Sequence, residues 1–130
     1  MAIRRGYPGR LGFAVELRHF SFGTIEVDGT TYDHDVVIDR GRVRTRVKGP
    51  SKTLRAEYGH TPLSLAEDIP WDCETLVVGT GAAGSLPVTD DVVREAERRG
   101  VRLVMAPTAD AIGELERANP STNAVLHLTC

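Results

Sequence analysis

A glycine-rich run directly after an apolar segment is the feature that most constrains the fold of this chain. Residues 79–84 have the sequence Gly-Thr-Gly-Ala-Ala-Gly and follow Leu76-Val77-Val78. This is the G-x-G-x-x-G spacing by which a strand-to-helix turn brings backbone N–H groups against a pyrophosphate. The pattern predicts a buried strand that ends in a tight turn with few side chains.

The residues after the third glycine argue against a dinucleotide site. In a Rossmann unit the helix begins within the motif, so that its N-terminus faces the phosphates. Here the helical pattern begins only at Thr89, and the carboxylates of Asp90 and Asp91 would repel a phosphate placed there. The acidic residue that binds the ribose, expected about 20 residues further on, is missing at the end of the next predicted strand, residues 101–105. We therefore predict no NAD(P) or FAD and assign no cofactor.

Two interpretations of the turn remain open. In the first, the glycines only form a tight strand exit beneath a neighbouring loop. In the second, the turn binds a small anion or another small ligand, because Thr80 and Thr108 both follow predicted parallel strands, where open α/β sheets bind ligands. Free N–H groups and two hydroxyls suit a carboxylate or a phosphate. The candidate ligand-binding residues are Gly79, Thr80, Gly81, Gly84 and Thr108.

Length and charge limit the classes of partner. The 130 residues are expected to form a single domain, residues 1–130. The 16 basic and 18 acidic residues leave a net charge of −2, so the chain has no global field that would attract nucleic acid or an anionic membrane. No apolar run approaches the roughly 20 residues that a membrane span needs. We therefore predict neither a nucleic-acid nor a membrane partner.

The cysteines and the N-terminal residues bear on localisation. Cys73 and Cys130 lie far apart and form no C-x-x-C pair, which favours free thiols in a reducing compartment. Three arginines precede the first acidic residue, a weak likeness to a transit peptide, but the apolar piece 11–15 is too short and glycine-broken for a secretory signal. We predict cytoplasmic localisation. The three arginines are Arg4, Arg5 and Arg10.

The part of the chain before Pro70 has the pattern of short strands and turns. Asp28-Gly29 is a strong hairpin signal, because both turn residues tolerate positive φ. In residues 43–47 arginine alternates with Val and Thr, which predicts one face exposed to water. Lys48–His60 is predicted to be a loop, and Ser64–Glu67 has the spacing of a capping box for a very short helix. The predicted strands are residues 13–17, 24–27, 30–32, 36–38 and 43–47.

After Pro70 the pattern alternates between strand and helix. The apolar strand 75–78 is expected at the centre of the sheet, and the crossover rule makes strand 101–105 parallel to it. Thr89 begins a helix that directs Val92, Val93 and Ala96 inward and ends at Gly100. A second helix, residues 109–118 after Thr108, precedes a final strand at residues 124–129.

No residue set satisfies the requirements of a catalytic or metal site. Asp33 and Asp35 share one face of a strand while His34 takes the other, so we assign no metal ligands and expect Asp35 to accept backbone hydrogen bonds. His127 in an apolar strand is more typical of a structural histidine than of a base paired with Cys130, because residues three apart on a strand face opposite sides. We assign no catalytic residue.

Several short motifs occur in a fixed order along the chain. They are Phe22-Gly23-x-Ile25, Asp28-Gly29, Tyr32, Asp35, Gly79-Thr80-Gly81, Thr108-x-x-Ala111 and Leu126–Cys130. Together they resemble the adipogenesis-associated Mth-like domain family, which includes a mitochondrial assembly factor of complex I, the NADH:ubiquinone oxidoreductase. The likeness covers nearly the whole chain and implies a three-layer α/β fold, in which a mixed central sheet has helices on its faces and a small N-terminal β layer.

The resemblance implies no particular chemistry. We therefore favour a non-enzymatic interaction or assembly-type protein with a protein partner of unknown identity. The alternative is a small-molecule or anion-binding protein, or an enzyme, that uses the Gly79–Gly84 turn.

Overall fold

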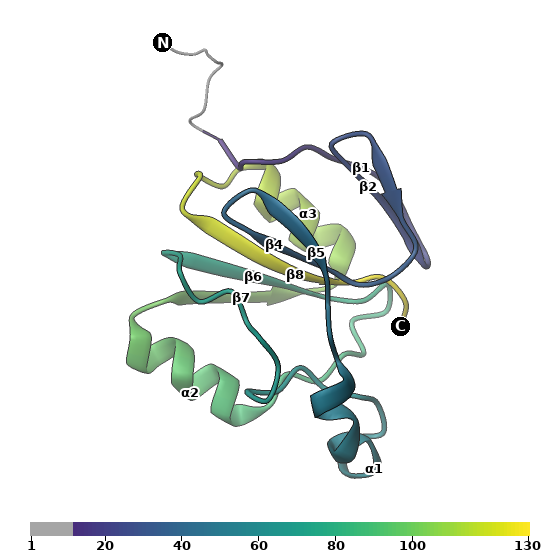
Figure 1. The fold of residues 1–130 in the computed structure, drawn as a ribbon, viewed down its shortest axis with the longest axis vertical. Coiled ribbons are helices and arrows are strands. Elements are labelled where there is room, and N and C mark those ends of the chain that lie inside the picture. The colour runs from purple at the N-terminus through teal and green to yellow at the C-terminus, as the bar shows by residue number, and fades with distance from the viewer. Residues whose placement is uncertain (1–11) are drawn as a thin grey trace.

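The computed structural model describes residues 12–130, which form two β-sheets and three α-helices (Figure 1). Arg4, Arg5 and Arg10 lie outside the described residues. The larger sheet has the strand order β5-β4-β8-β6-β7. Strands β6, β7 and β8 are parallel to one another, whereas β4 is antiparallel to both β5 and β8, so the sheet is mixed as predicted. Its strands are β4 (Val36–Asp39), β5 (Arg42–Thr45), β6 (Thr75–Thr80), β7 (Arg102–Ala106) and β8 (Thr122–His127).

One face of this sheet is covered by a small antiparallel sheet and by α3 (Thr108–Glu116). Ile25 of the small sheet and Leu115 of α3 are fully buried against Val77 and Leu126 of the larger sheet. These apolar side chains make the first half of the core. The strands of the small sheet are β1 (Leu17–Ser21), β2 (Thr24–Val27) and β3 (Thr30–Tyr32).

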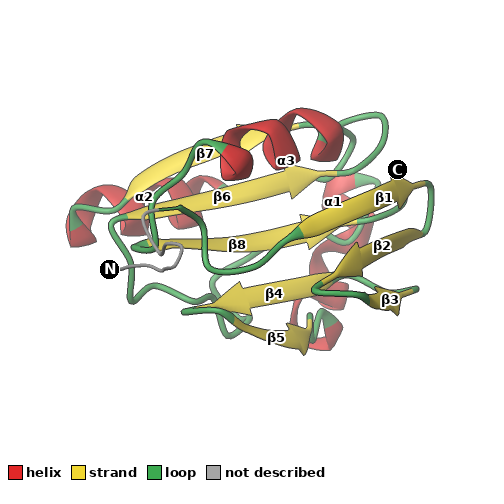
Figure 2. Cartoon of the chain, turned by 90° about the horizontal axis from the view of Figure 1, so that it is seen from above, coloured by secondary structure: helices red, strands yellow, loops and turns green. Residues whose placement is uncertain are grey.

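The opposite face is covered by α2 (Asp90–Arg99) and by irregular segments at residues 61–71 and 86–88. Val92 and Ala96 of α2 pack with Val78 and Val125, which alternate along their strands with the side chains of the first half. The two apolar clusters enclose the central strands, and the predicted three-layer α/β architecture is confirmed (Figure 2). Within residues 12–130, no helix has the length and apolar character needed to cross a membrane.

The turn predicted at Asp28-Gly29 is confirmed. Asp28 and Gly29 adopt φ values of 49° and 83° between β2 and β3. Arg40 and Gly41 do the same, at 51° and 82°, between β4 and β5. The first predicted strand is displaced, since β1 occupies Leu17–Ser21 rather than residues 13–17.

The predicted loop at Lys48–His60 is wrong, because this segment contains a 3-10 helix, η1 (Gly49–Leu54), followed by α1 (Arg55–Tyr58). Pro50 lies in the first turn of η1, where the missing N–H of proline costs nothing. Gly59 ends α1 with a φ of 80°, a conformation that glycine adopts without strain.

The helices also depart from the sequence pattern in detail. α2 begins after Thr89 and ends at Gly100 as predicted, but Val93 is 39% exposed and only Val92 and Ala96 are buried. Residues four apart lie on one helix face, and Val93 lies beside that face rather than on it. α3 is shorter than predicted, since it begins at Thr108 and ends at Glu116.

Candidate functional site

The glycine turn lies at the carboxyl end of β6, against the beginning of α3. A Cβ added to Gly79 would lie 2.8 Å from Thr108 Oγ1 and 3.0 Å from Leu126 Cδ2, so only glycine fits there. The Gly81 N–H donates to Thr108 Oγ1 at 2.8 Å, and that hydroxyl in turn donates to the His127 carbonyl at 2.6 Å. The structure thus brings Gly79, Gly81 and Thr108 together, as their positions at strand ends predicted.

The backbone N–H groups of the turn are bonded to the last two residues of this sequence. Ala82 N–H donates to the Thr129 carbonyl at 2.6 Å. Ala83 and Ser85 donate to the Cys130 carbonyl at 3.2 and 2.9 Å. The donors that the anion hypothesis assigned to a ligand therefore contact carbonyl oxygens of the chain itself.

Gly84 and Thr80 are the two remaining candidate residues of the turn. Gly84 has a φ of +71° and its missing Cβ would lie 3.3 Å from Pro107 Cγ. Thr80 is 8% exposed, and its hydroxyl makes no hydrogen bond within residues 12–130. The α2 helix begins only at Asp90, after residues 85–89, as predicted. Ligand binding by Gly79, Thr80, Gly81, Gly84 and Thr108 remains a prediction.

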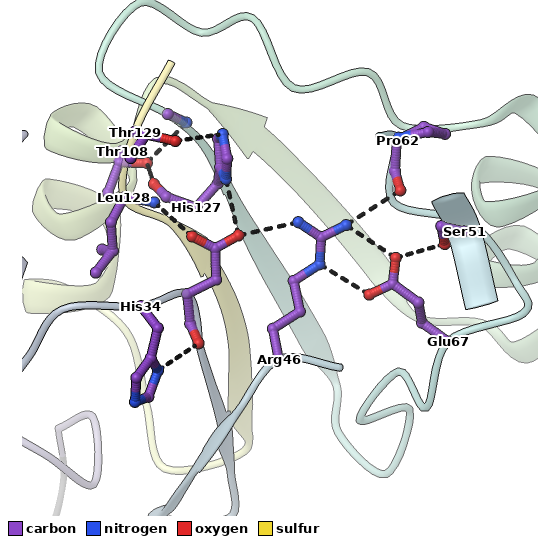
Figure 3. Close-up of polar contacts among 11 residues, drawn as sticks. His34, Arg46, Ser51, Pro62, Glu67, Thr108, His127, Leu128 and Thr129 are labelled. Carbon is purple, nitrogen blue, oxygen red and sulfur yellow. Dashed lines mark hydrogen bonds and ion pairs between the residues drawn. The ribbon is translucent and has the colours of Figure 1, made fainter. Parts of the chain in front are cut away.

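Beside the turn, a buried ion cluster joins segments that are far apart in the sequence (Figure 3). The Arg46 side chain is 1% exposed, and its Nη1 donates to Asp35 Oδ2 at 3.0 Å. Its Nε and Nη2 donate to the two oxygens of Glu67, each at 2.8 Å. Such a two-pronged contact is the geometry in which a guanidinium binds a carboxylate most strongly.

The prediction that residues 43–47 have one exposed face is wrong for Arg46. β5 ends at Thr45, and Arg46 turns inward where Asp35 and Glu67 neutralise it. Burial alone would lower the pKa of Arg46, but the bonds from the two carboxylates raise it. Arginine seldom lies inside a protein unless it is paired in this way.

The capping-box prediction is also wrong, because residues 64–67 form a turn and no helix. The Glu67 carboxylate accepts a hydrogen bond from Ser51 Oγ at 2.6 Å instead of capping a helix. Ser51 Oγ also lies 2.7 Å from Ser64 Oγ. The Arg46–Glu67 pairing could not be found from the sequence, since the local signal at Glu67 matched another structure.

Asp35 connects this cluster to His127. His127 Nδ1 lies 2.8 Å from Asp35 Oδ2, and the Leu128 N–H donates to Asp35 Oδ1 at 2.9 Å. The expected backbone bond to Asp35 is therefore present, together with two side-chain partners that were not predicted. Burial raises the pKa of Asp35, but the bonds from His127, Leu128 and Arg46 outweigh burial and lower it to about 2.

The ionised Asp35 determines the proton positions on His127. A carboxylate only accepts hydrogen bonds, so Nδ1 carries a proton and Nε2 faces Thr129 Oγ1 at 3.4 Å. The order carboxylate, imidazole, hydroxyl resembles the arrangement that activates a nucleophile in hydrolases. Here, however, the same Asp35 oxygen also binds Arg46, so the carboxylate is shared between the imidazole and the guanidinium.

The remaining chemical candidates are not brought together. Cys73 and Cys130 are free, and burial raises the pKa of the Cys73 thiol. No group of three or more His, Cys, Asp or Glu side chains in the described part of the chain is arranged to hold a metal ion. His34 Nδ1 lies 3.1 Å from the Asp35 carbonyl oxygen, and the His34 ring lies edge-on to the ring of Tyr32.

Comparison with known proteins relates this fold to several solved structures. The chain is similar to the conserved hypothetical protein PH1505 from Pyrococcus horikoshii OT3, with 28% identity, a TM-score of 0.71, and coverage of 88% of this chain and 99% of that one. A structure named MT938 has 22% identity, a TM-score of 0.65 and coverage of 89% and 99%. XCC1710 from Xanthomonas campestris shares the fold at 13% identity and a TM-score of 0.59, covering 98% and 92%.

Comparison with curated proteins finds no match for this chain. A family model described as "Protein of unknown function (DUF498/DUF598)" matches residues 17–125, which include the small sheet, the glycine turn and most of β8. It is the Mth-like family that the sequence motifs predicted. The chain therefore belongs to the DUF498/DUF598 family.

Proposed function

We propose that this protein works by binding a protein partner, and that segment 47–66 carries the contact surface. Three apolar side chains of this segment face solvent: Val47 is 62% exposed, Leu65 40% and Tyr58 37%. Their exposure, on a segment that the chain holds firmly from beneath, is the observation that carries the proposal.

The inner side of segment 47–66 is anchored by the ion cluster. Ser51 is fully buried and donates to Glu67, while Arg46 Nη2 donates to the Pro62 carbonyl at 3.1 Å. Fixed in this way, the segment loses little conformational freedom when a partner binds, which favours affinity. The cluster then serves to hold a surface in place rather than to carry out a reaction.

The charges of the segment indicate the chemistry of the partner. Lys48, Lys52 and Arg55 are exposed and form no ion pair within residues 12–130, against a single exposed acid, Glu57. A partner with apolar side chains surrounded by carboxylates would complement them. The proposal extends the sequence resemblance to a family that includes an assembly factor of complex I.

The test is affinity purification from a lysate of the source cells, followed by mass spectrometry. We expect a stoichiometric protein with the wild-type chain that is lost with the double variant Tyr58→Ser/Leu65→Ser. Phe22→Ser is the matched control, because Phe22 is 66% exposed but lies in the turn between β1 and β2. Retention of the partner by the double variant, or its loss with the control alone, contradicts the proposed surface.

The alternative function, binding of a small anion or metabolite at the Gly79–Gly84 turn, is supported by the Thr80 hydroxyl. A buried hydroxyl without a partner usually signals a bound molecule or water. If a ligand uses it, Thr80→Val should leave the free energy of unfolding within about 0.5 kcal/mol while a metabolite that co-purifies with the wild type is lost. A stability loss of roughly 0.5–1.5 kcal/mol with binding intact would instead assign the hydroxyl a structural role.

A further inference from the structure

The larger sheet has an apolar edge strand whose outer side is unpaired. β7 pairs with β6 on one side only, and no other strand in residues 12–130 lies beyond it (Figure 2). Leu103 and Val104 are partly exposed and Met105 is 48% exposed. An open edge of this kind is a template for strand addition, which proteins generally block with charges, prolines or bulges.

The hydrogen bonds of β7 identify the main-chain groups that point outward. Arg102 N–H donates toward β6, to the Glu74 carbonyl at 2.9 Å. Main-chain groups alternate along a strand, so Val104 and Ala106 also face β6. Leu103 and Met105 therefore present their N–H and C=O groups to the open side.

These groups are spaced for an antiparallel copy of the same strand. With a two-fold axis at Val104, Leu103 lies opposite Met105 of the second copy, and the two residues exchange both main-chain hydrogen bonds. The symmetry-related pair, Met105 of the first copy and Leu103 of the second, adds the same number of hydrogen bonds. Side chains directly opposite lie on one face, so the exposed Met105 would be covered by Leu103 of the second copy.

The charges at the two ends of β7 complement each other in the same pairing. Arg102 at the start of β7 and Asp110 in the first turn of α3 are both exposed, and neither forms an ion pair within residues 12–130. Arg102 and Val104 line the same depression as Glu114, so Arg102 lies on the α3 face. Antiparallel pairing brings Arg102 of one copy to the strand end where α3 of the other begins.

The geometry points to a second copy of this chain as the occupant of the β7 edge, giving a two-fold dimer with one continuous sheet across both copies. This inference goes beyond the proposed function, which uses a different surface, segment 47–66. A two-fold contact of this type is closed, so it removes the open edge without further growth. The dimer would therefore present two copies of segment 47–66 to partners.

The test is sedimentation equilibrium of the purified chain over a range of concentrations. We expect a dimer whose dissociation constant increases about tenfold or more in Met105→Lys, because a buried lysine opposite Leu103 is costly. Phe22→Lys is the matched control, since Phe22 is also exposed, at 66%, but lies in the turn between β1 and β2. It should leave the dissociation constant unchanged.

Reversing the charges of Arg102 and Asp110 tests the register of the paired β7 strands independently of the lysine variant. Arg102→Glu and Asp110→Arg should each weaken the dimer, and the double variant should restore it. In hydrogen exchange, the amides of Leu103 and Met105 should gain protection on dimerisation, while those of Arg102 and Val104 are protected already. A chain that stays monomeric up to about 1 mM, or a dimer unchanged by Met105→Lys and by both charge variants, overturns the inference.

Discussion

The carboxyl end of the larger sheet and its β7 edge differ in whether their polar groups have partners among residues 12–130. At the carboxyl end, Arg46 binds both Asp35 and Glu67, and the N–H groups of the glycine turn bind the carbonyls of Thr129 and Cys130. Along β7, apolar residues leave the outward-facing main-chain groups without partners among residues 12–130. The charged side chains and the N–H groups of the turn thus bind partners within the chain, whereas the apolar strand β7 is open to another molecule.

The two edges of the sheet sharpen this contrast. β5, at the far edge, carries Arg42 and Arg44, and the turn before it carries Arg40. Charged side chains on an edge oppose pairing with another strand. β7 has a charge only at its first residue, Arg102, so the protein protects one edge and leaves the other available.

The largest expected effect is at the ion cluster. Arg46→Met leaves the carboxylates of Asp35 and Glu67 buried without their cation and should destabilise the protein by about 3–5 kcal/mol. Arg44→Met is the matched control two positions earlier. The Arg44 side chain is 34% exposed and lies 3.6 Å from an exposed Asp68 carboxylate, so its loss should cost about 1 kcal/mol or less. Equal losses in denaturant unfolding would contradict the contrast.

The second-largest effect is expected from acid, which should lower the free energy of unfolding through the same ion cluster. The pKa of Asp35 is lowered from 3.8 to about 2 in the folded state, so the unfolded chain binds more protons between these values. The stabilisation from ionised Asp35 is complete above about pH 5 and is lost as the pH falls toward 2, an effect of roughly 2 kcal/mol. Asp35→Asn should remove this part of the pH dependence from unfolding curves. An unchanged slope in the variant would assign the acid sensitivity to other groups.

A somewhat smaller effect is expected at the glycine turn. Gly81 has a φ of +102°, and a Cβ there would lie 2.2 Å from the Cys130 carbonyl carbon. Gly81→Ala should therefore cost at least about 1 kcal/mol, with the residues near Cys130 displaced. Gly23→Ala is the control, because Gly23 has a φ of +90° but open space around it. A larger loss at Gly23 than at Gly81 would mean that contact with Cys130 contributes little.

The smallest change in stability is expected on the open edge. Met105→Ser removes an exposed side chain that is 48% accessible, and should alter the free energy of unfolding of the monomer by about 0.5 kcal/mol or less. Dilute samples examined by thermal and denaturant unfolding give this value without a contribution from association. A loss comparable to that of Arg46→Met would show that β7 depends on Met105 for its own folding.

Most of the fold could be predicted because its signals are local. The Asp28-Gly29 turn, the apolar strand that becomes β6, and the helix between Thr89 and Gly100 each depend on residues adjacent in sequence. Where a local pattern competes with a contact between distant residues, prediction failed. Ser64–Glu67 matches a capping box, but Glu67 binds Arg46 instead, because a buried guanidinium gains more from a carboxylate than a short helix gains from a cap.

The candidate site was harder to predict than the fold. Gly79, Gly81 and Thr108 were placed correctly at the carboxyl ends of β6 and β7, since parallel strands share that edge. Their contact with Thr129 and Cys130 gave no signal, because it requires the end of β8 to lie beside the turn.

The sequence by itself determined most of the strands and turns, because periodicity and turn chemistry act over a few neighbouring residues. The arrangement of the layers was implied by the family resemblance. Only the tertiary structure decided which polar groups meet. Asp35 and His127 are separated by 92 positions, and their bond depends on the antiparallel pairing of β4 with β8. A buried charge is stable only beside its partner, and the chain brings such partners together only when the whole sheet is formed.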